Sequence, residues 1–353
     1  MFEHNVISKL FKEDLASITS AQNIIIEALQ QGYGTSTEVH ICNSGMNAIY
    51  ATLSQVYELT KGVQSNKKIL QLGWLYIDSL ELLHNYDFPT INLLNVNNID
   101  IIAEYLEQHH EEIAFVFTEL ISNPTLQCLD FKALHLLLQQ YNIPLIIDSS
   151  IASAYTTNAL QYCDIIIESL TKFANGHADV LQGAIIVNRN SKTLSVSKLL
   201  FKRIETAYIE DIQRMAICIE NYSDRVQKIS NNTKQLYAYL KNSKQLKSIY
   251  CSEDNSNFQK ICLNNNTVGI ISIVTKEDLA HTYDQLDLAK GPSLGTEFTL
   301  CMPYVYLAHY HEIQDPEKYA IIEAQGLDKN LLRISVGIEP IEALIEKFKI
   351  FIS

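Results

Sequence analysis

Arginine is scarce in this chain: five occur among its 353 residues, and none precedes Arg189. The net charge is −13, and the sequence contains no block of like charges and no stripe rich in lysine and arginine. Proteins that bind nucleic acid or anionic membranes through electrostatics carry such basic stripes. We therefore expect neither nucleic acid nor a membrane as a partner.

The sequence also lacks paired cysteines and long apolar runs. Its seven cysteines never occur with C-x-x-C spacing, and most lie inside apolar stretches. This predicts buried free thiols, with no disulfide framework and no metal site. Residues 1–15 lack the apolar core of a signal peptide, and no apolar run approaches the ~18 residues of a membrane span. We expect a cytoplasmic protein without a membrane span.

An alternation of β-rich and helical segments dominates the remainder. Runs typical of strands occur at 67–72, 112–119, 143–149, 163–169 and 183–188. Periodic segments typical of helices lie between them, for example 130–142. Runs that are apolar on both faces and alternate with helices indicate an α/β fold with a mostly parallel sheet covered by helices.

The length suits one large domain and a smaller one. We expect a short amino-terminal arm, partly helical, over residues 1–38 and a large domain over 39–225. Residues 203–245 predict long, mostly polar helices, and 226–353 mix strands with helices as in a smaller α+β domain.

Polar residues end three of the predicted strands. They are Glu119 to Asn123, Asp148 to Ser150, and Ser169 to Lys172. Ligands of open parallel sheets bind at the carboxyl ends of the strands. We therefore expect these segments to form one site.

A lysine at such a strand end can anchor pyridoxal phosphate (PLP), which also needs an acid for its ring nitrogen and a cradle for its phosphate. Lys172 can supply the anchor and Asp148 the acid. Ser44, Gly45 and Met46 open a predicted helix whose free N–H groups suit a phosphate. The hydroxyls of Ser169 and Thr171 could close this cradle, and Tyr76 could stack on the ring.

Each of these residues also has a plain structural interpretation. Lys172 can be a loop charge, Asp148 a cap, and Ser44 an ordinary helix N-cap. A Ser-x-x-Lys acyl hydrolase, with Ser169 as nucleophile and Lys172 as base, is a further alternative. It is weakly supported, because the same spacing recurs twice elsewhere, Ser169 follows a strand, and no K-T-G or S-D-N partner occurs.

Five segments together resemble one known family. "NSGMNAI" (43–49), "ELISNPTLQCLD" (119–130), "IIDSSIASAY" (146–155), "SLTKFANGHADVLQG" (169–183) and "LLRISVGIEPIEALI" (331–345) occur in the order found in the Cys/Met-metabolism PLP enzymes. That family includes cystathionine γ-synthase, cystathionine β- and γ-lyases and methionine γ-lyase, all of fold type I. The similarity covers roughly residues 40–353.

The resemblance implies a role for each matching residue. Lys172 would form the internal aldimine and then move protons between substrate carbons, with a quinonoid storing the negative charge. Arg333 would bind the substrate α-carboxylate through its planar fork, and Ser293 would also contact the substrate. The implied cofactor contacts are Ser44, Gly45, Met46, Ser169 and Thr171 at the phosphate, Asp148 at the ring nitrogen, Asn123 near the phenolic oxygen, and Tyr76 on the ring and in proton transfer.

The implied activity is β- or γ-elimination, or γ-replacement, on an amino acid of the cysteine, methionine or homoserine type. A homodimer is implied, with a homotetramer as the alternative. A degenerate PLP-binding protein or non-catalytic partner subunit is the alternative reading of the same residues.

Two departures from the family pattern are visible. The family's Tyr-x-Arg segment, which reaches a neighbour's phosphate, has no counterpart, and Tyr33, a lysine, or N–H and hydroxyl donors alone would have to replace it. The position of a family glutamate near the substrate γ-carbon is Phe298 here, and Glu297 is one residue early. We interpret His177 as a loop-stabilising residue and not as a base.

Overall fold

The computed structural model describes residues 2–61, 66–86, 88–94, 96 and 98–351, with side chains from residue 17 onward. A seven-stranded sheet in the order β1-β7-β6-β5-β4-β2-β3 forms its centre. Its strands are β1 (Thr37–Cys42), β2 (Lys68–Leu72), β3 (Thr90–Leu93), β4 (Ile113–Glu119), β5 (Leu145–Asp148), β6 (Ile165–Ser169) and β7 (Gly183–Asn188). All neighbours from β6 to β3 are parallel, and β7 is antiparallel to both β6 and β1. The mostly parallel sheet is confirmed.

The five predicted strands all occur, while β1 and β3 were not expected. Both lie at edges of the sheet, where their side chains are largely half-exposed. They therefore lack the continuous apolar runs that reveal a strand buried on both faces.

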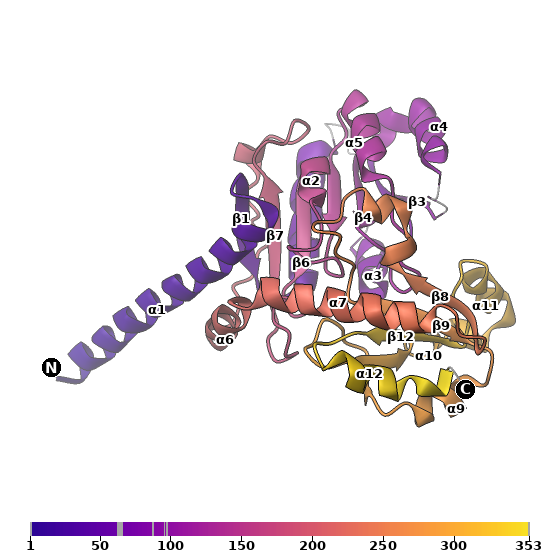
Figure 1. The fold of residues 1–353 in the computed structure, drawn as a ribbon. Helices are drawn as coiled ribbons and strands as arrows, with labels where there is room; N and C mark the ends of the chain where they lie inside the picture. Colours follow the sequence, from indigo (N-terminus) through magenta and orange to yellow (C-terminus); the bar gives the residue numbers. More distant parts are fainter. Residues whose placement is uncertain (1, 62–65, 87, 95, 97, 352–353) are drawn as a thin grey trace.

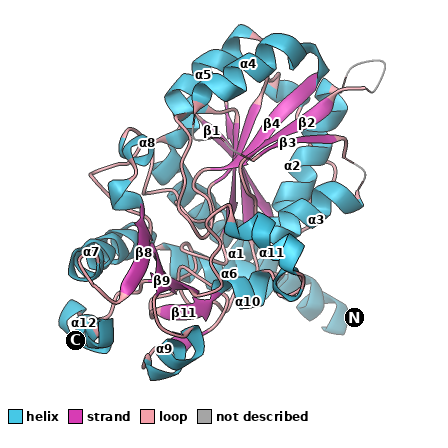
Figure 2. Ribbon diagram, turned by 90° about the vertical axis from the view of Figure 1, so that its right-hand side faces the viewer, coloured by secondary structure: helices cyan, strands magenta, loops and turns pink. Residues whose placement is uncertain are grey.

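Helices cover both faces of this sheet. Apolar residues of α2 (Gly45–Thr60) and α3 (Ile77–Asn85) pack on one face. Residues of α4 (Ile99–His109), α5 (Phe131–Gln140) and α6 (Ile209–Ile219) pack on the other. Figure 2 shows α2 and α3 across the strands from α4 and α5.

Alternation along the strands decides which polar side chain faces which layer. Ile146 and Ile167 pack in the cluster under α2, whereas Ile166 packs in the opposite cluster. Since successive side chains of a strand point to opposite faces, Asp148 and Ser169 share the α2 face. Glu168 lies on the other face.

A five-stranded sheet in the order β10-β11-β12-β9-β8 forms the carboxyl-terminal part. Its strands are β8 (Leu246–Cys251), β9 (Ile270–Thr275), β10 (Ala289–Lys290), β11 (Leu300–Pro303) and β12 (Leu331–Ser335). The accompanying helices are α8 (Ser256–Gln259), α9 (Leu279–Gln285), α10 (Tyr304–Ala308), α11 (Pro316–Glu323) and α12 (Ile341–Lys347). This agrees with the expected smaller α+β unit.

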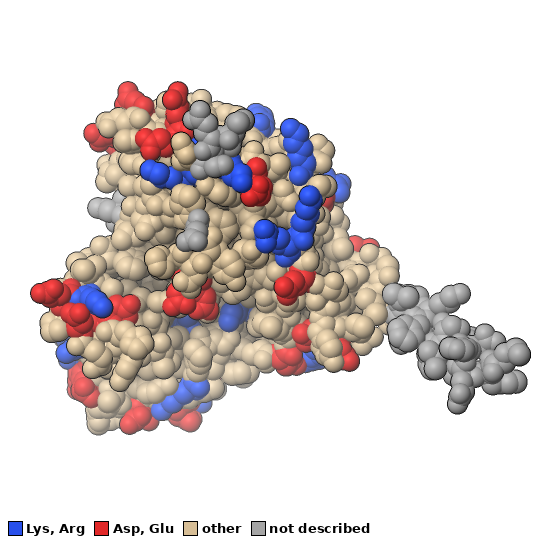
Figure 3. Space-filling view, turned by 180° about the vertical axis from the view of Figure 1, so that it is seen from behind, with Lys and Arg blue, Asp and Glu red and all other residues tan. Residues whose placement is uncertain are grey.

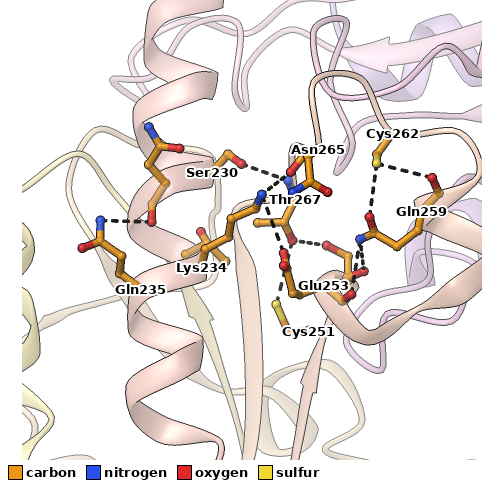
Figure 4. Close-up of polar contacts among 12 residues, drawn as sticks. Ser230, Lys234, Gln235, Cys251, Glu253, Gln259, Cys262, Asn265 and Thr267 are labelled. Atoms are coloured by element: carbon orange, nitrogen blue, oxygen red, sulfur yellow. Dashed lines mark hydrogen bonds and ion pairs between the residues drawn. The ribbon is translucent and has the colours of Figure 1, made fainter.

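The helix α7 (Tyr222–Leu240) links the two sheets and contains the domain boundary expected at residue 225. Its first half contributes Tyr222 and Val226 to the core of the large sheet, and its second half contributes Leu236 and Leu240 to that of the small sheet. Polar contacts fix α7 to the loop before β9, because Lys234 bonds the carbonyl of Asn265 (Figure 4).

The arm is a single helix, α1 (Phe2–Tyr33), and extends from the body with the amino terminus at its far end (Figure 1). Ala21, Ile25 and Leu29 bury its second half against the large core. All seven cysteines are free, five of them buried, which confirms the prediction of free thiols. None of the described helices is long and apolar enough to cross a membrane.

Figure 3 shows one face of the molecule, on which several lysine and arginine side chains gather at the upper right. Acidic side chains predominate in the lower half of that face and at its upper left.

Candidate active site

The polar strand ends meet as expected. Glu119 pairs with Asp148 across β4 and β5, and Asp148 pairs with Ile167 across β5 and β6. Lys172 follows in the turn after β6, where its backbone N–H donates to the carbonyl of Ser169 at 3.1 Å. Three adjacent strands therefore deliver two carboxyl groups and one amine to the same end of the sheet.

The start of α2 faces Ser169. Ser44 caps the helix by accepting a hydrogen bond from the N–H of Asn47 at 3.1 Å. The N–H groups of Gly45 and Met46 have no partner among the described residues. A Cβ at Gly45 would lie 2.8 Å from the Cβ of Ser169, so only glycine lets this turn approach so closely. The result is an anion cradle of free N–H groups beside a hydroxyl.

Asp148 and Glu119 are carboxyl groups that have no cationic partner among the described residues. Asp148 is buried, and its Oδ1 accepts the Ser150 N–H at 2.9 Å. Glu119 accepts the Tyr76 N–H at 2.6 Å. Burial raises the pKa of Asp148, and burial together with the neighbouring Asp148 raises the pKa of Glu119. Neither forms an ion pair with a described residue, so this end of the sheet suits a cationic ring nitrogen.

Lys172 is half-buried, and its Nζ lies 3.4 Å from the hydroxyl oxygen of Ser293. Burial, and to a lesser extent the charge of Arg333, lowers the pKa of its amine. A lowered pKa increases the fraction of neutral amine near pH 7. Neutral amine is the form that can attack a carbonyl carbon or accept a proton.

Arg333 lies buried in the middle of β12. One end of its guanidinium, Nη2, donates to the carbonyls of Pro292 and Ser293 at 2.6 and 2.8 Å. Nη1 lies 3.5 Å from Oδ1 of Asn123, and Nε has no partner among the described residues. Burial lowers the pKa of Arg333 to about 10. A buried cation with an open Nε edge is suited to a carboxylate ligand.

Three further predicted residues have more limited contacts. Tyr76 precedes α3 and is 44% exposed, so its ring is free to meet a ligand. Asn123 precedes a cis proline, and its carbonyl accepts the Tyr304 hydroxyl at 3.1 Å. The Thr171 hydroxyl is engaged with the backbone of Gln182, so its role toward a phosphate remains a prediction.

The two departures from the family pattern have structural counterparts. Tyr33 is not a free donor for a phosphate, because its hydroxyl donates to Oε2 of Glu168 at 2.6 Å. Glu297 turns to Arg225, with 3.3 Å between Nη1 and Oε1, and its N–H donates to the Gly176 carbonyl. Phe298 is 45% exposed. His177 is exposed, and only its backbone N–H bonds the loop, through Asn175.

Sequence reasoning missed Arg225. This buried arginine donates to the carbonyls of Phe173, Ala174 and Cys218, at 3.2, 2.6 and 3.1 Å, and so holds the turn that follows Lys172. The signal was present: Arg225 stands beside Val226 and Ile229 on the apolar face of α7. A cation on such a face must find partners.

Sequence reasoning also missed Glu168. Glu168 is 1% exposed, and its carboxyl group accepts hydrogen bonds from the Tyr33 and Tyr222 hydroxyls. The signal was a carboxylate at the end of a run that is apolar on both faces.

Comparisons with known proteins agree with this geometry. A family model described as "Cys/Met metabolism PLP-dependent enzyme" matches residues 20–351. The L-2-amino-4-chloropent-4-enoate dechlorinase/desaturase of Streptantibioticus cattleyicolor is 32% identical, over 91% of this chain and 66% of that protein. Cystathionine gamma-synthase of Neurospora crassa is 31% identical, over 88% of this chain and 51% of that protein. The chain thus spans half to two thirds of these relatives.

The fold has solved counterparts. The cystathionine gamma synthase of Xanthomonas oryzae pv. oryzae, in complex with cystathionine, superimposes with a TM-score of 0.77. The two chains are 19% identical, and the match covers 92% of this chain and 83% of that one. At this identity the match establishes the fold type I architecture. Because the family model spans nearly the whole sequence, this chain belongs to the Cys/Met metabolism PLP-dependent enzymes.

Proposed function

We propose that this chain catalyses elimination or replacement at the γ-carbon of an amino acid, with PLP as cofactor. The observation that carries this proposal is the placement of Lys172 and Arg333 around Ser293. The amine of Lys172 meets the Ser293 hydroxyl, and the guanidinium of Arg333 binds the Ser293 carbonyl. An amine and a cation that can bind a carboxylate therefore lie on two sides of Ser293. This arrangement suits an α-amino acid as the substrate.

The residues present fit the cofactor. Asp148 offers a buried carboxylate without a cation, and Gly45 and Met46 offer free N–H groups beside Ser169. We assign Asp148 to the ring nitrogen, the α2 start with Ser169 to the phosphate, and Tyr76 to the ring face. Bound PLP would supply an electron sink for negative charge at the substrate α-carbon.

The chain's own residues would then do the positioning and the proton transfer. The donors of Arg333 that its carbonyl partners leave open are Nε and the weakly bonded Nη1, and we assign them to the substrate α-carboxylate, which they would orient. Lys172, with its lowered pKa, accepts and returns protons at the substrate carbons. Asn123 approaches Nη1 of Arg333 and so helps to fix the guanidinium.

The relatives favour reaction at the γ-carbon. One relative is named cystathionine gamma-synthase. The other is named for the removal of chlorine from L-2-amino-4-chloropent-4-enoate, whose carbon 4, which carries the chlorine, is the γ-carbon. Phe298 stands where an acidic residue was expected, which favours an uncharged substituent at that end of the substrate.

Turnover tests this proposal. Purified protein with PLP is incubated with cystathionine, an O-acyl homoserine plus cysteine, methionine, and 2-amino-4-chloropent-4-enoate, and thiol, chloride and keto acid are measured. At least one γ-substituted substrate is expected to react, and Lys172→Ala to abolish the reaction. PLP binding without turnover of any of them would favour the degenerate, non-catalytic alternative. The homodimer also remains a prediction, and light scattering of the purified protein tests it.

A further inference from the structure

Glu168 is a buried carboxyl group that the proposed reaction does not use. It is the residue of β6 directly before Ser169, and its side chain lies on the face of the sheet opposite α2. Tyr33, the last residue of α1, donates to its Oε2 at 2.6 Å. Tyr222, the first residue of α7, donates to its Oε1. One carboxyl group thus joins the arm helix, the strand that leads to Lys172, and α7.

Among the described residues, no cation contacts the carboxyl group of Glu168. The titratable groups that face it are Tyr33 of α1, Tyr222 of α7 and Tyr155, whose ring packs edge-on against Tyr222 at 5.1 Å, and the charge of Asp148 acts on it from the other face of the sheet. Burial raises the pKa of Glu168 to about 7, and the Asp148 charge adds to this, whereas the two tyrosine hydroxyls oppose it. Glu168 therefore changes charge near neutral pH.

A change of charge must alter the hydrogen bonds of this cluster. The carboxylate accepts one hydroxyl on each oxygen, but the protonated group is itself a donor. Gln182 offers a new acceptor, since its buried side-chain amide has no partner among the described residues. It precedes Gly183, which pairs with Ser169, so it is a diagonal neighbour of Glu168 in the sheet. When Glu168 is protonated, it can therefore lose the hydrogen bond from Tyr33 or Tyr222 and donate a hydrogen bond to Gln182 instead.

The cluster of Glu168, Tyr33 and Tyr222 is connected to the turn that contains Lys172 at both ends of that turn. Glu168 directly precedes Ser169, whose N–H is held by the Ser150 hydroxyl at 2.8 Å. Tyr222 lies one helical turn before Arg225, which binds the carbonyls of Phe173 and Ala174 just after Lys172. Fixing Tyr222 to Glu168 therefore also fixes where Arg225 meets the turn.

We propose that Glu168 is a positioning residue: as a carboxylate it clamps α1 and α7 to β6 and holds the Ser169–Lys172 turn in the geometry that binds PLP. This inference rests on the proposed function and adds to it a cofactor affinity that depends on the charge of Glu168. If only the charged clamp binds PLP, affinity falls by up to about tenfold between pH 8 and pH 6.

The test is the dissociation constant of PLP, measured by equilibrium dialysis from pH 5.5 to 8.5. The variants are Glu168→Gln, Tyr33→Phe and the matched control Tyr155→Phe, which loses a different bond to α1, from its hydroxyl to the Ala28 carbonyl at 2.7 Å. The dissociation constant of the wild type is divided by that of Glu168→Gln at each pH, because this ratio cancels the effect of the titration of PLP itself. That ratio is expected to change about tenfold across neutral pH, and Tyr33→Phe to weaken binding several-fold at pH 8 only. Tyr155→Phe is expected to keep the wild-type profile.

A pH-independent ratio, or equal effects of Tyr33→Phe and Tyr155→Phe, would overturn the inference. Amide hydrogen exchange of residues 168–176 in PLP-free protein supplies the second readout. After correction for intrinsic exchange rates, the protection of these residues relative to that of strand β5 is expected to fall below pH 7 in wild type and to show no such step in Glu168→Gln. Protein that binds no PLP yet shows this step would refute the proposed function and leave the clamp intact. Absence of the step would refute the clamp.

Discussion

Replacing Glu168 by glutamine tests how much the buried charge of Glu168 lowers the free energy of unfolding. The pKa of Glu168 is about 7 in the folded chain, against an ordinary value of 4.5. Between these values the folded state binds a proton that the unfolded state has released. Stability therefore falls as the pH rises from 4.5 to 7. A difference of about 2.5 pH units corresponds to roughly 3 kcal/mol in the free energy of unfolding.

Glutamine is nearly isosteric, can accept a hydroxyl through its carbonyl oxygen, and carries no charge. We expect the free energy of unfolding of Glu168→Gln not to fall in this way as the pH rises. The difference in free energy of unfolding between the variant and the wild type should therefore rise by about 3 kcal/mol between pH 4.5 and 7.5. Urea unfolding of PLP-free protein, followed by circular dichroism at four pH values, measures the difference. Buried acids that do not act on Glu168, such as Glu119, are present in both proteins, so their contributions cancel in the comparison. Parallel stability curves for the two proteins would refute the reasoning.

Three further predictions concern the site. Gly45→Ala places a Cβ 2.8 Å from that of Ser169, so PLP affinity should fall at least ~10-fold with an unchanged circular dichroism spectrum, as dialysis can show. Arg225→Met leaves three carbonyls unbonded and should cost about 3 kcal/mol of unfolding free energy in urea, and an unchanged midpoint would contradict this. Arg333→Lys keeps the charge but loses the fork, so KM should rise about tenfold or more while kcat changes less.

Much of the large sheet could be predicted because its central strands are apolar on both faces. The runs at 112–119 and 163–169 became β4 and β6, and the polar residues that end them do converge. The buried position of Arg333 was also predictable, because a lone arginine in an apolar strand needs partners. The edge strands β1 and β3 escaped prediction because half-exposed edges carry no such pattern.

Contacts between distant segments could not be predicted in the same way. Tyr33 and Glu168 are 135 residues apart, and Glu168 and Tyr222 are 54 apart, so no local spacing links them. The family's glutamate position falls on Phe298, and the fold turns the neighbouring Glu297 to Arg225 behind the Lys172 turn. Such partners are chosen by tertiary packing and not by local sequence.

The central claim is that Lys172 carries the cofactor, and one measurement tests it most directly. The protein is incubated with PLP, reduced with borohydride, digested and analysed by mass spectrometry. We expect a phosphopyridoxyl group on the peptide that contains Lys172 and none on the Lys172→Ala protein. A label on another lysine, or no label on any peptide at saturating PLP, would contradict the assignment.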